Sequence, residues 1–224
     1  MFSNSPFSII VKKSKVHADN TSLYVLIKKE IEQYGLDCSL NHIDVSCVTS
    51  MSYLFAHRKF EGKCPDISEW DTRNVKHVDM MFTKSDFDGD ISSWDMHNVE
   101  TMSNMFSFNR AFNCDISNWD TSKVSDMNSM FYLSNFNNDI SKWNVKNVKY
   151  MQCMFYGNYY FNNDISNWEL DSIENLSGIF ADSKFNVDIG KWKKYIKPET
   201  NTRDMFTHNH DYSFDKTIFS NSMN

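Results

Sequence analysis

The chain has 224 residues, a formal net charge of −6 and 15% aromatic residues. The aromatic content is too high for a disordered chain, and the length suffices for one continuous core. Within residues 38–192, 21 acidic residues face 13 basic ones. This balance argues against nucleic acid as a partner and favours a basic protein surface.

The sequence shows no recognisable targeting signal. No apolar run approaches the ~18 residues of a membrane span, and the run Phe7–Val11 is too short for a signal peptide, with its lysines after it. The C-terminus, S-N-S-M-N, carries no lipid-attachment or wall-anchoring pattern. The five cysteines are irregularly spaced and odd in number, which fits a reducing compartment. We therefore expect a cytoplasmic protein without membrane contact; the alternative is the cell surface, reached by a non-classical route.

Residues 1–37 do not share the pattern of the rest and are predicted to form an N-terminal cap. Phe7–Val11 is expected to be a short strand, and Asn20 or Thr21 can cap a helix that ends at Gly35. Four apolar residues fall on one face of this helix: Leu23, Ile27, Ile31 and Tyr34. Such a cap would cover the open end of a repeat array.

Residues 38–206 consist of about seven repeats of 24–27 residues. All six tryptophans occupy one slot of the repeat, at spacings of 24, 25, 24, 25 and 24 residues: Trp70, Trp94, Trp119, Trp143, Trp168 and Trp192. A fixed period in this range is typical of stacked supersecondary units. The sequence therefore predicts a solenoid, followed by a C-terminal cap or tail at 207–224.

Each repeat has two halves. In F-x-x-D-I-S, Phe87 and Ile91 would share one face of a strand, with Asp90 on the other. In V-x-x-M-x-x-M-F, the apolar residues lie at i, i+3, i+6 and i+7, the stripe of a helical turn. The predicted fold class is an α/β repeat solenoid of the leucine-rich-repeat type, with a parallel β-sheet on one face, short helical turns on the other and a strand-plus-helix N-terminal cap.

One repeat departs from the rule. Three additional residues lie between Phe60 and Asp66, in a segment that contains Gly62, Cys64 and Pro65. This segment is expected to bulge as a loop. It is either a contact site or a tolerated surface insertion.

The repeats resemble a known family. Residues 112–131 read F-N-C-D-I-S-N-W-D-T-S-K-V-S-D-M-N-S-M-F, which closely resembles the roughly 25-residue repeat of bacterial surface proteins related to BspA-like leucine-rich repeats. The resemblance covers about residues 20–206. It implies a leucine-rich-repeat-like fold and a binding or adhesion role without catalytic residues.

The candidate site is the predicted outer face of the strands, where an Asp recurs before each Ile. Stacked repeats would place these side chains in a file about 4.8 Å apart. The file either meets a basic partner or is a structural ladder in which each Asp binds backbone amides. The predicted partner-binding residues are Asp66, Ser68, Asp88, Asp90, Ser92, Asn113, Asp115, Ser117, Asn137, Asp139, Ser141, Asn162, Asp164 and Ser166.

Catalytic and metal motifs are the last consideration. Cys38, His42, Cys47, His57 and Cys64 lack zinc-site spacing, and no calcium loop, nucleophile motif or phosphate-binding glycine loop occurs. We therefore expect no enzyme activity, no metal and no cofactor. The expected function is that of a protein, monomeric on its own, that sequesters or inhibits one basic protein partner, as in toxin immunity. The alternative is bacterial surface adhesion or host-matrix binding.

Overall fold

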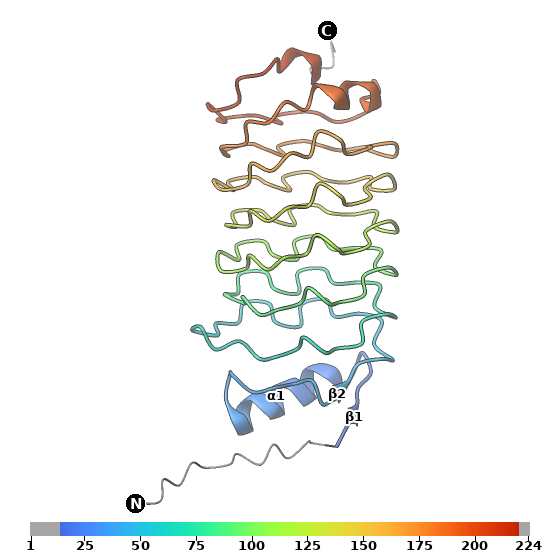
Figure 1. Ribbon diagram of the computed structural model, residues 1–224, viewed down its shortest axis with the longest axis vertical. Coiled ribbons are helices and arrows are strands. Elements are labelled where there is room, and N and C mark those ends of the chain that lie inside the picture. Colours follow the sequence, from blue (N-terminus) through green and yellow to red (C-terminus); the bar gives the residue numbers. More distant parts are fainter. Residues whose placement is uncertain (1–13, 220–224) are drawn as a thin grey trace, which may run out of the picture.

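The computed structural model describes residues 14–219. Its repeats lie one above another as successive coils along the long axis, from α1 near one end to the C-terminal residues at the other (Figure 1). Backbone hydrogen bonds join neighbouring coils, as between Phe82 N and the carbonyl of Met105, which precedes the equivalent residue Phe106, at 2.9 Å. The expected strand at Phe7–Val11 lies outside the described residues.

The predicted fold class is wrong. Within residues 14–219, regular structure is limited to β1 (Val16–His17), α1 (Leu23–Tyr34), β2 (Ile43–Asp44) and two 3₁₀ helices, η1 (Gly190–Tyr195) and η2 (Thr217–Phe219). β1 and β2 form a two-stranded parallel sheet in which Val16 pairs with Ile43 and His17 with Asp44. The coils are otherwise turns and irregular backbone. The leucine-rich-repeat arrangement, a continuous sheet on one face and helices on the other, is not formed.

The two halves of the repeat also differ from their predicted conformations. The F-x-x-D-I-S half is irregular and ends in a turn. One isolated parallel bridge joins Ser39 to Asp66 in this half. The other isolated bridges lie in the half predicted to be helical, and they run from coil to coil through Ser50, His77, Thr101, Asp126, Tyr150, Asn175 and Asn201. From Thr101 onward, strand pairing within the described residues is thus confined to one residue per coil.

The half predicted to be helical is bent by residues with positive φ. Met80 and Lys84 have φ of 55° and 52°, and the other coils repeat this pair four residues apart. Successive backbone amides then donate alternately to a carbonyl of the same coil and to one of the next coil. Met81 N donates to Val78 O within the coil at 3.2 Å, whereas Phe82 N donates to the next coil. A helix would use all these amides internally, so the bent path is the one that joins coils.

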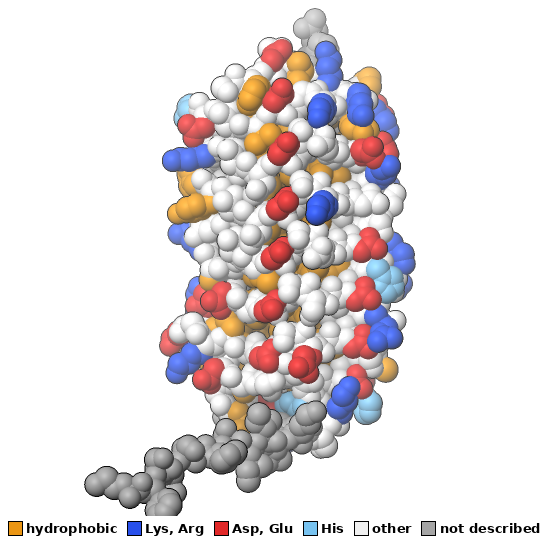
Figure 2. Space-filling model, in the orientation of Figure 1, with side chains coloured by type: hydrophobic (Ala, Val, Ile, Leu, Met, Phe, Trp, Pro, Cys, Tyr) orange, Lys and Arg blue, Asp and Glu red, His pale blue; other side chains and the backbone are white. Residues whose placement is uncertain are grey.

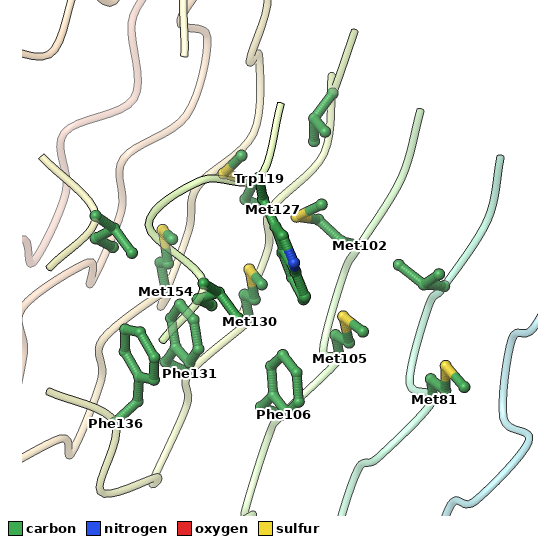
Figure 3. Packing of buried hydrophobic residues seen from close by; sticks show 14 of the residues in the cluster. Met81, Met102, Met105, Phe106, Trp119, Met127, Met130, Phe131, Phe136 and Met154 are labelled. Atoms are coloured by element: carbon green, nitrogen blue, oxygen red, sulfur yellow. The ribbon is translucent and has the colours of Figure 1, made fainter. Parts of the chain in front are cut away.

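The interior contains the side chains that the repeat predicts. The Ile, Trp, Val, Met and Phe slots are buried, and Figure 3 shows Met105 and Phe106 of one coil beside Met130 and Phe131 of the next. The Phe106 and Phe131 rings stack with centroids 5.8 Å apart and planes 4° apart. Buried aromatic residues of this kind dominate the energetics of a core.

The tryptophan slot also has a polar function. Each indole Nε1–H donates to a backbone carbonyl of the preceding coil, at 3.1–3.2 Å: Trp70 to Leu40, Trp94 to Ile67, Trp119 to Ile91, Trp143 to Ile116, Trp168 to Ile140 and Trp192 to Ile165. A buried indole requires such an acceptor. No other apolar side chain both fills the slot and satisfies the carbonyl, which explains why Trp recurs there.

The alternation of 24 and 25 residues has a structural cause. Each coil has two left-handed residues, and from Ser85 onward the position after the second one alternates between Ser and Asn. Ser occupies it at Ser85, Ser134 and Ser183, and Asn at Asn109, Asn158 and Asn209. The coils with Asn have one more residue between this position and the next aromatic residue. Asn109 Nδ2 donates to Phe87 O at 3.0 Å and to Ser85 Oγ at 3.3 Å. Its Oδ1 accepts the amides of Ala111 and Phe112 at 2.9 and 3.0 Å. The longer coils are therefore those whose extra residue is held by a buried Asn.

The N-terminal helix covers the first coil. α1 buries Leu23, Ile27 and Ile31, as predicted, whereas Tyr34 is 50% exposed and does not belong to that face. Gly35 ends the helix with φ of 91°. Asn20 does not cap the helix; its side chain instead accepts the amides of Thr49 and Ser50 in the first coil.

The described part of the C-terminal tail packs on the last coil. Tyr212 occupies the Phe slot of the repeat, 4.0 Å from the ring of Phe206 between centroids. Phe219 of η2 is also buried against this end. None of the helices in residues 14–219 has the length and apolar character needed to cross a membrane.

Candidate protein-interaction face

The recurrent aspartates form what we call the Asp file: Asp66, Asp90, Asp115, Asp139, Asp164 and Asp188. In each, Oδ1 accepts the backbone amide two residues later, at 2.8–3.1 Å. The turn after each Asp is therefore stabilised by its own side chain. This is the local amide-binding function that the sequence allowed for these residues.

The Asp file is also exposed and charged. The backbone amides of Ser92, Ser117, Ser141 and Ser166 lower the pKa of Asp90, Asp115, Asp139 and Asp164, respectively. Lys142 lowers the pKa of Asp115 and Asp139 further. Figure 2 shows acidic side chains in a file along the long axis of the visible face. The file combines a structural turn with a row of ionised carboxylates.

Three predicted neighbours of the Asp file, together with Asn186, form a second ladder that we call the Asn ladder: Asn113, Asn137, Asn162 and Asn186. Each side-chain oxygen accepts the backbone amide of the next member: Asn137 N donates to Asn113 Oδ1 at 2.8 Å and Asn186 N to Asn162 Oδ1 at 2.7 Å. The bond from Asn162 N to Asn137 Oδ1 is longer, 3.4 Å. Sequence reasoning missed this ladder, although the recurrence of Asn at one slot was its signal.

The serines of the predicted face differ in accessibility. Ser68, Ser117 and Ser141 are half-buried and Ser92 is exposed, but Ser166 is only 7% exposed. Ser166 therefore offers little surface to a partner. The accessible part of the face consists of the Asp file, Asp88, Ser92 and the outer edges of the Asn ladder.

The segment with the additional residues lies at the N-terminal end of this face. Cys64 Sγ donates to Asp88 Oδ1 at 3.0 Å and accepts the Asp88 amide. Burial, and then the Asp88 carboxylate, raise the pKa of the Cys64 thiol to about 12. A thiol in this state is not a nucleophile. Residues 14–219 also contain no cluster of three His, Cys, Asp or Glu side chains suited to a metal ion.

Comparison with protein families identifies the repeats. Residues 27–134 and 108–219 both match the model of DUF285, described as Mycoplasma protein of unknown function. The chain belongs to the DUF285 family. This is a repeat-containing family related to BspA-like surface repeat proteins. No curated protein and no solved structure matches the chain.

The DUF285 match covers the coils on which the Asp file and the Asn ladder lie. It therefore assigns the repeat pattern to a family without assigning it a task. What this face does has to be argued from its own charges and contacts.

Proposed function

We propose that this DUF285 chain is a non-catalytic repeat protein that binds one basic protein partner along the Asp file. In its narrowest form, the chain sequesters and inhibits that partner, as an immunity protein does with a toxin. The proposal takes from the resemblance to BspA-like repeats only the expectation of a binding surface.

The observation that supports the proposal is the fixed geometry of the carboxylates. Asp90, Asp115 and Asp139 are each held by a backbone amide through one oxygen, and their side chains remain exposed. A side chain that is already ordered loses little entropy when a partner binds. A row of charge of one sign also accelerates encounter with a partner of opposite charge.

The non-catalytic part of the proposal is supported by the thiols. Burial is the main cause that raises the pKa of Cys64, Cys114 and Cys153. Catalytic cysteines instead have depressed pKa values. These three side chains fit a structural role in the coils.

The test separates charge from folding. Lysine at Asp115 or Asp139 would remove the bond to the turn amide, so charge reversal would disturb the coil itself. Asparagine keeps the Oδ1 acceptor and removes only the charge. The informative variant is therefore the triple substitution Asp115→Asn, Asp139→Asn and Asp164→Asn.

The assay is capture of partners from lysate of the source cells by the tagged chain, at low and high salt, followed by mass spectrometry and association kinetics with the purified partner. The matched control is Asp71→Asn, Asp120→Asn and Asp171→Asn, which removes the same charge outside the file. We expect a stoichiometric basic partner whose association is slowed at least tenfold by the file variant and little by the control. Equal rates for both variants would refute binding along the Asp file.

The second candidate, surface adhesion, rests on the family relationship to BspA-like surface repeat proteins. Cell fractionation distinguishes the two candidates, because adhesion requires the chain outside the cell. An extracellular chain that binds host-matrix protein and captures no intracellular partner would favour adhesion.

A further inference from the structure

Three aromatic side chains form an aromatic file beside the left-handed corners of successive coils: Phe108, Tyr132 and Tyr156. The centroids of Phe108 and Tyr132 are 5.2 Å apart, and those of Tyr132 and Tyr156 are 4.9 Å apart with planes at 17°. Lys84 Nζ lies 5.4 Å from the Phe108 centroid at the start of the file. A lysine of the chain itself therefore already contacts one end of this file by a cation–π interaction.

At the other end of the file, no lysine or arginine of residues 14–219 lies over the Tyr156 ring. The next coil carries Ala181 in the slot of Tyr156, so no ring within residues 14–219 continues the stack. Gly178, with φ of 63°, takes the slot of Cys153 and adds no side chain. A hollow of about 450 Å³ results, which we call the Tyr156 hollow; Cys153, Tyr156, Gly178, Ala181, Asp182 and His208 line it.

The hollow has a carboxylate beside the terminal ring. Asp182 Oδ1 lies 3.2 Å from His208 Nδ1, and a hydrogen bond from the Tyr156 hydroxyl to Asp182 raises the pKa of the phenol to about 12. The phenol is therefore neutral beside this carboxylate. Asp204 adds a second acidic group, and Arg203 lies at the lining as the one permanent cation among the lining residues.

We propose that the Tyr156 hollow receives a cationic side chain, arginine or lysine, of a partner protein, over the Tyr156 ring and next to Asp182. The proposal deepens the proposed function and rests on it for the identity of the partner, because a basic partner of the Asp file supplies such side chains. Arginine fits best, since its planar guanidinium stacks on an aromatic ring and binds a carboxylate through two N–H groups.

The Lys84–Phe108 contact is the reason to choose a cation over an apolar ligand. One end of the aromatic file already holds an ammonium group of the chain. The other end offers the same kind of ring together with two carboxylates, which strengthens attraction for a cation.

The direct test does not need the partner. Uniformly ¹⁵N-labelled full-length chain is titrated with Nα-acetyl-arginine amide, Nα-acetyl-lysine amide and the neutral analogue Nα-acetyl-citrulline amide. We expect saturable amide shifts at Gly178, Ala181, Asp182 and His208 with the two cations, at millimolar concentration, and at least fivefold weaker binding of citrulline amide. The expected dissociation constant is about 1 mM. The absence of saturable shifts at ligand concentrations up to about 50 times that value would overturn the proposal.

Two variants separate the hollow from general charge. Asp182→Asn tolerates the local φ of 50°, since Asn adopts the left-handed region readily, and removes the carboxylate. Ala181→Tyr extends the aromatic file into the hollow. Both should abolish the shifts, whereas Asp171→Asn, which removes one exposed charge elsewhere, should leave them unchanged. Binding that is unaffected by Asp182→Asn would also overturn the proposal.

The outcomes for the hollow and for the Asp file are distinguishable. A partner that is lost with the file variant but retained by Ala181→Tyr would support the proposed function and refute the use of the hollow. Saturable arginine binding without any captured partner would support the hollow as a cation site and refute the proposed function.

Discussion

The buried Asn109 provides the most direct test of how coils are held together. Its side chain is fully buried and makes four hydrogen bonds, two as donor and two as acceptor. Replacement by alanine would leave the carbonyl of Phe87 and the amides of Ala111 and Phe112 without this partner. An unsatisfied buried polar group costs about 1–3 kcal/mol. Phe87 and Phe112 are buried whereas Ala111 is exposed, so the two buried groups predict a loss of roughly 2 kcal/mol or more.

The assay is urea unfolding followed by tryptophan fluorescence and far-UV circular dichroism. With a slope of about 1–3 kcal/mol per M for a chain of this kind, Asn109→Ala should lower the unfolding midpoint by roughly 0.7 M or more at unchanged slope. The matched control is Asn135→Ala, which removes one exposed hydrogen bond to Arg110 O. Water replaces that bond, so the control should lose less than about 1 kcal/mol.

The comparison of the two variants decides the result. If Asn109→Ala unfolds at the same urea concentration as Asn135→Ala, the buried Asn does not hold the coil pair together. The alternation of 24 and 25 residues would then need another explanation.

Three further predictions concern the same coils. Trp119→Phe keeps an aromatic ring but deprives Ile91 O of its indole donor, and should lower the free energy of unfolding in urea by about 1–3 kcal/mol. Trp119→Ala should lower it by about 3–5 kcal/mol, and an equal loss in the two variants would contradict this prediction. Gly157→Ala places a Cβ in steric overlap with Leu133 Cδ2 at φ of 63° and should cost more than Gly62→Ala, where φ is 74° but nothing lies within 4 Å, and the latter should cost about 1–2 kcal/mol; equal melting temperatures would contradict the close contact. The pKa values of Asp90, Asp115, Asp139 and Asp164 are lower in the folded chain than in the unfolded chain, so these carboxylates stabilise the folded chain. Their full contribution is present above the unfolded Asp pKa of about 3.9, and it is lost as the pH falls through the lower folded pKa values. The urea midpoint should therefore fall in acid, and less so in the triple Asn variant of the Asp file; identical acid profiles would show that these carboxylates do not stabilise the folded chain.

Part of the architecture follows from the sequence alone. The regular spacing of Trp94, Trp119 and Trp143 predicts repeated units, and the recurrent Ile, Val, Met and Phe slots predict which side chains are buried. These predictions succeed because the composition of a core depends on which positions are apolar in every copy. The helical face of α1 is predictable for the same reason, apart from Tyr34.

The candidate site was predictable only in outline. The recurrence of Asp90, Asp115 and Asp139 indicated one file of carboxylates and left their function open. The ladder of Asn137 on Asn113 could not be derived, because it joins residues 24 apart through a side-chain acceptor. The Tyr156 hollow also depends on contacts between successive coils, because Ala181 occupies the position in one coil that Tyr156 occupies in the coil before it.

The sequence by itself determined the period, the membership of the core and the positions of the polar slots. The tertiary structure alone decided the path of the backbone. The apolar spacing of Val78, Met81 and Phe82 fits a helical turn, yet Met80 is left-handed, because that conformation directs alternate amides to the next coil. A pattern of side chains records burial, whereas these hydrogen bonds join backbone groups that carry no residue identity.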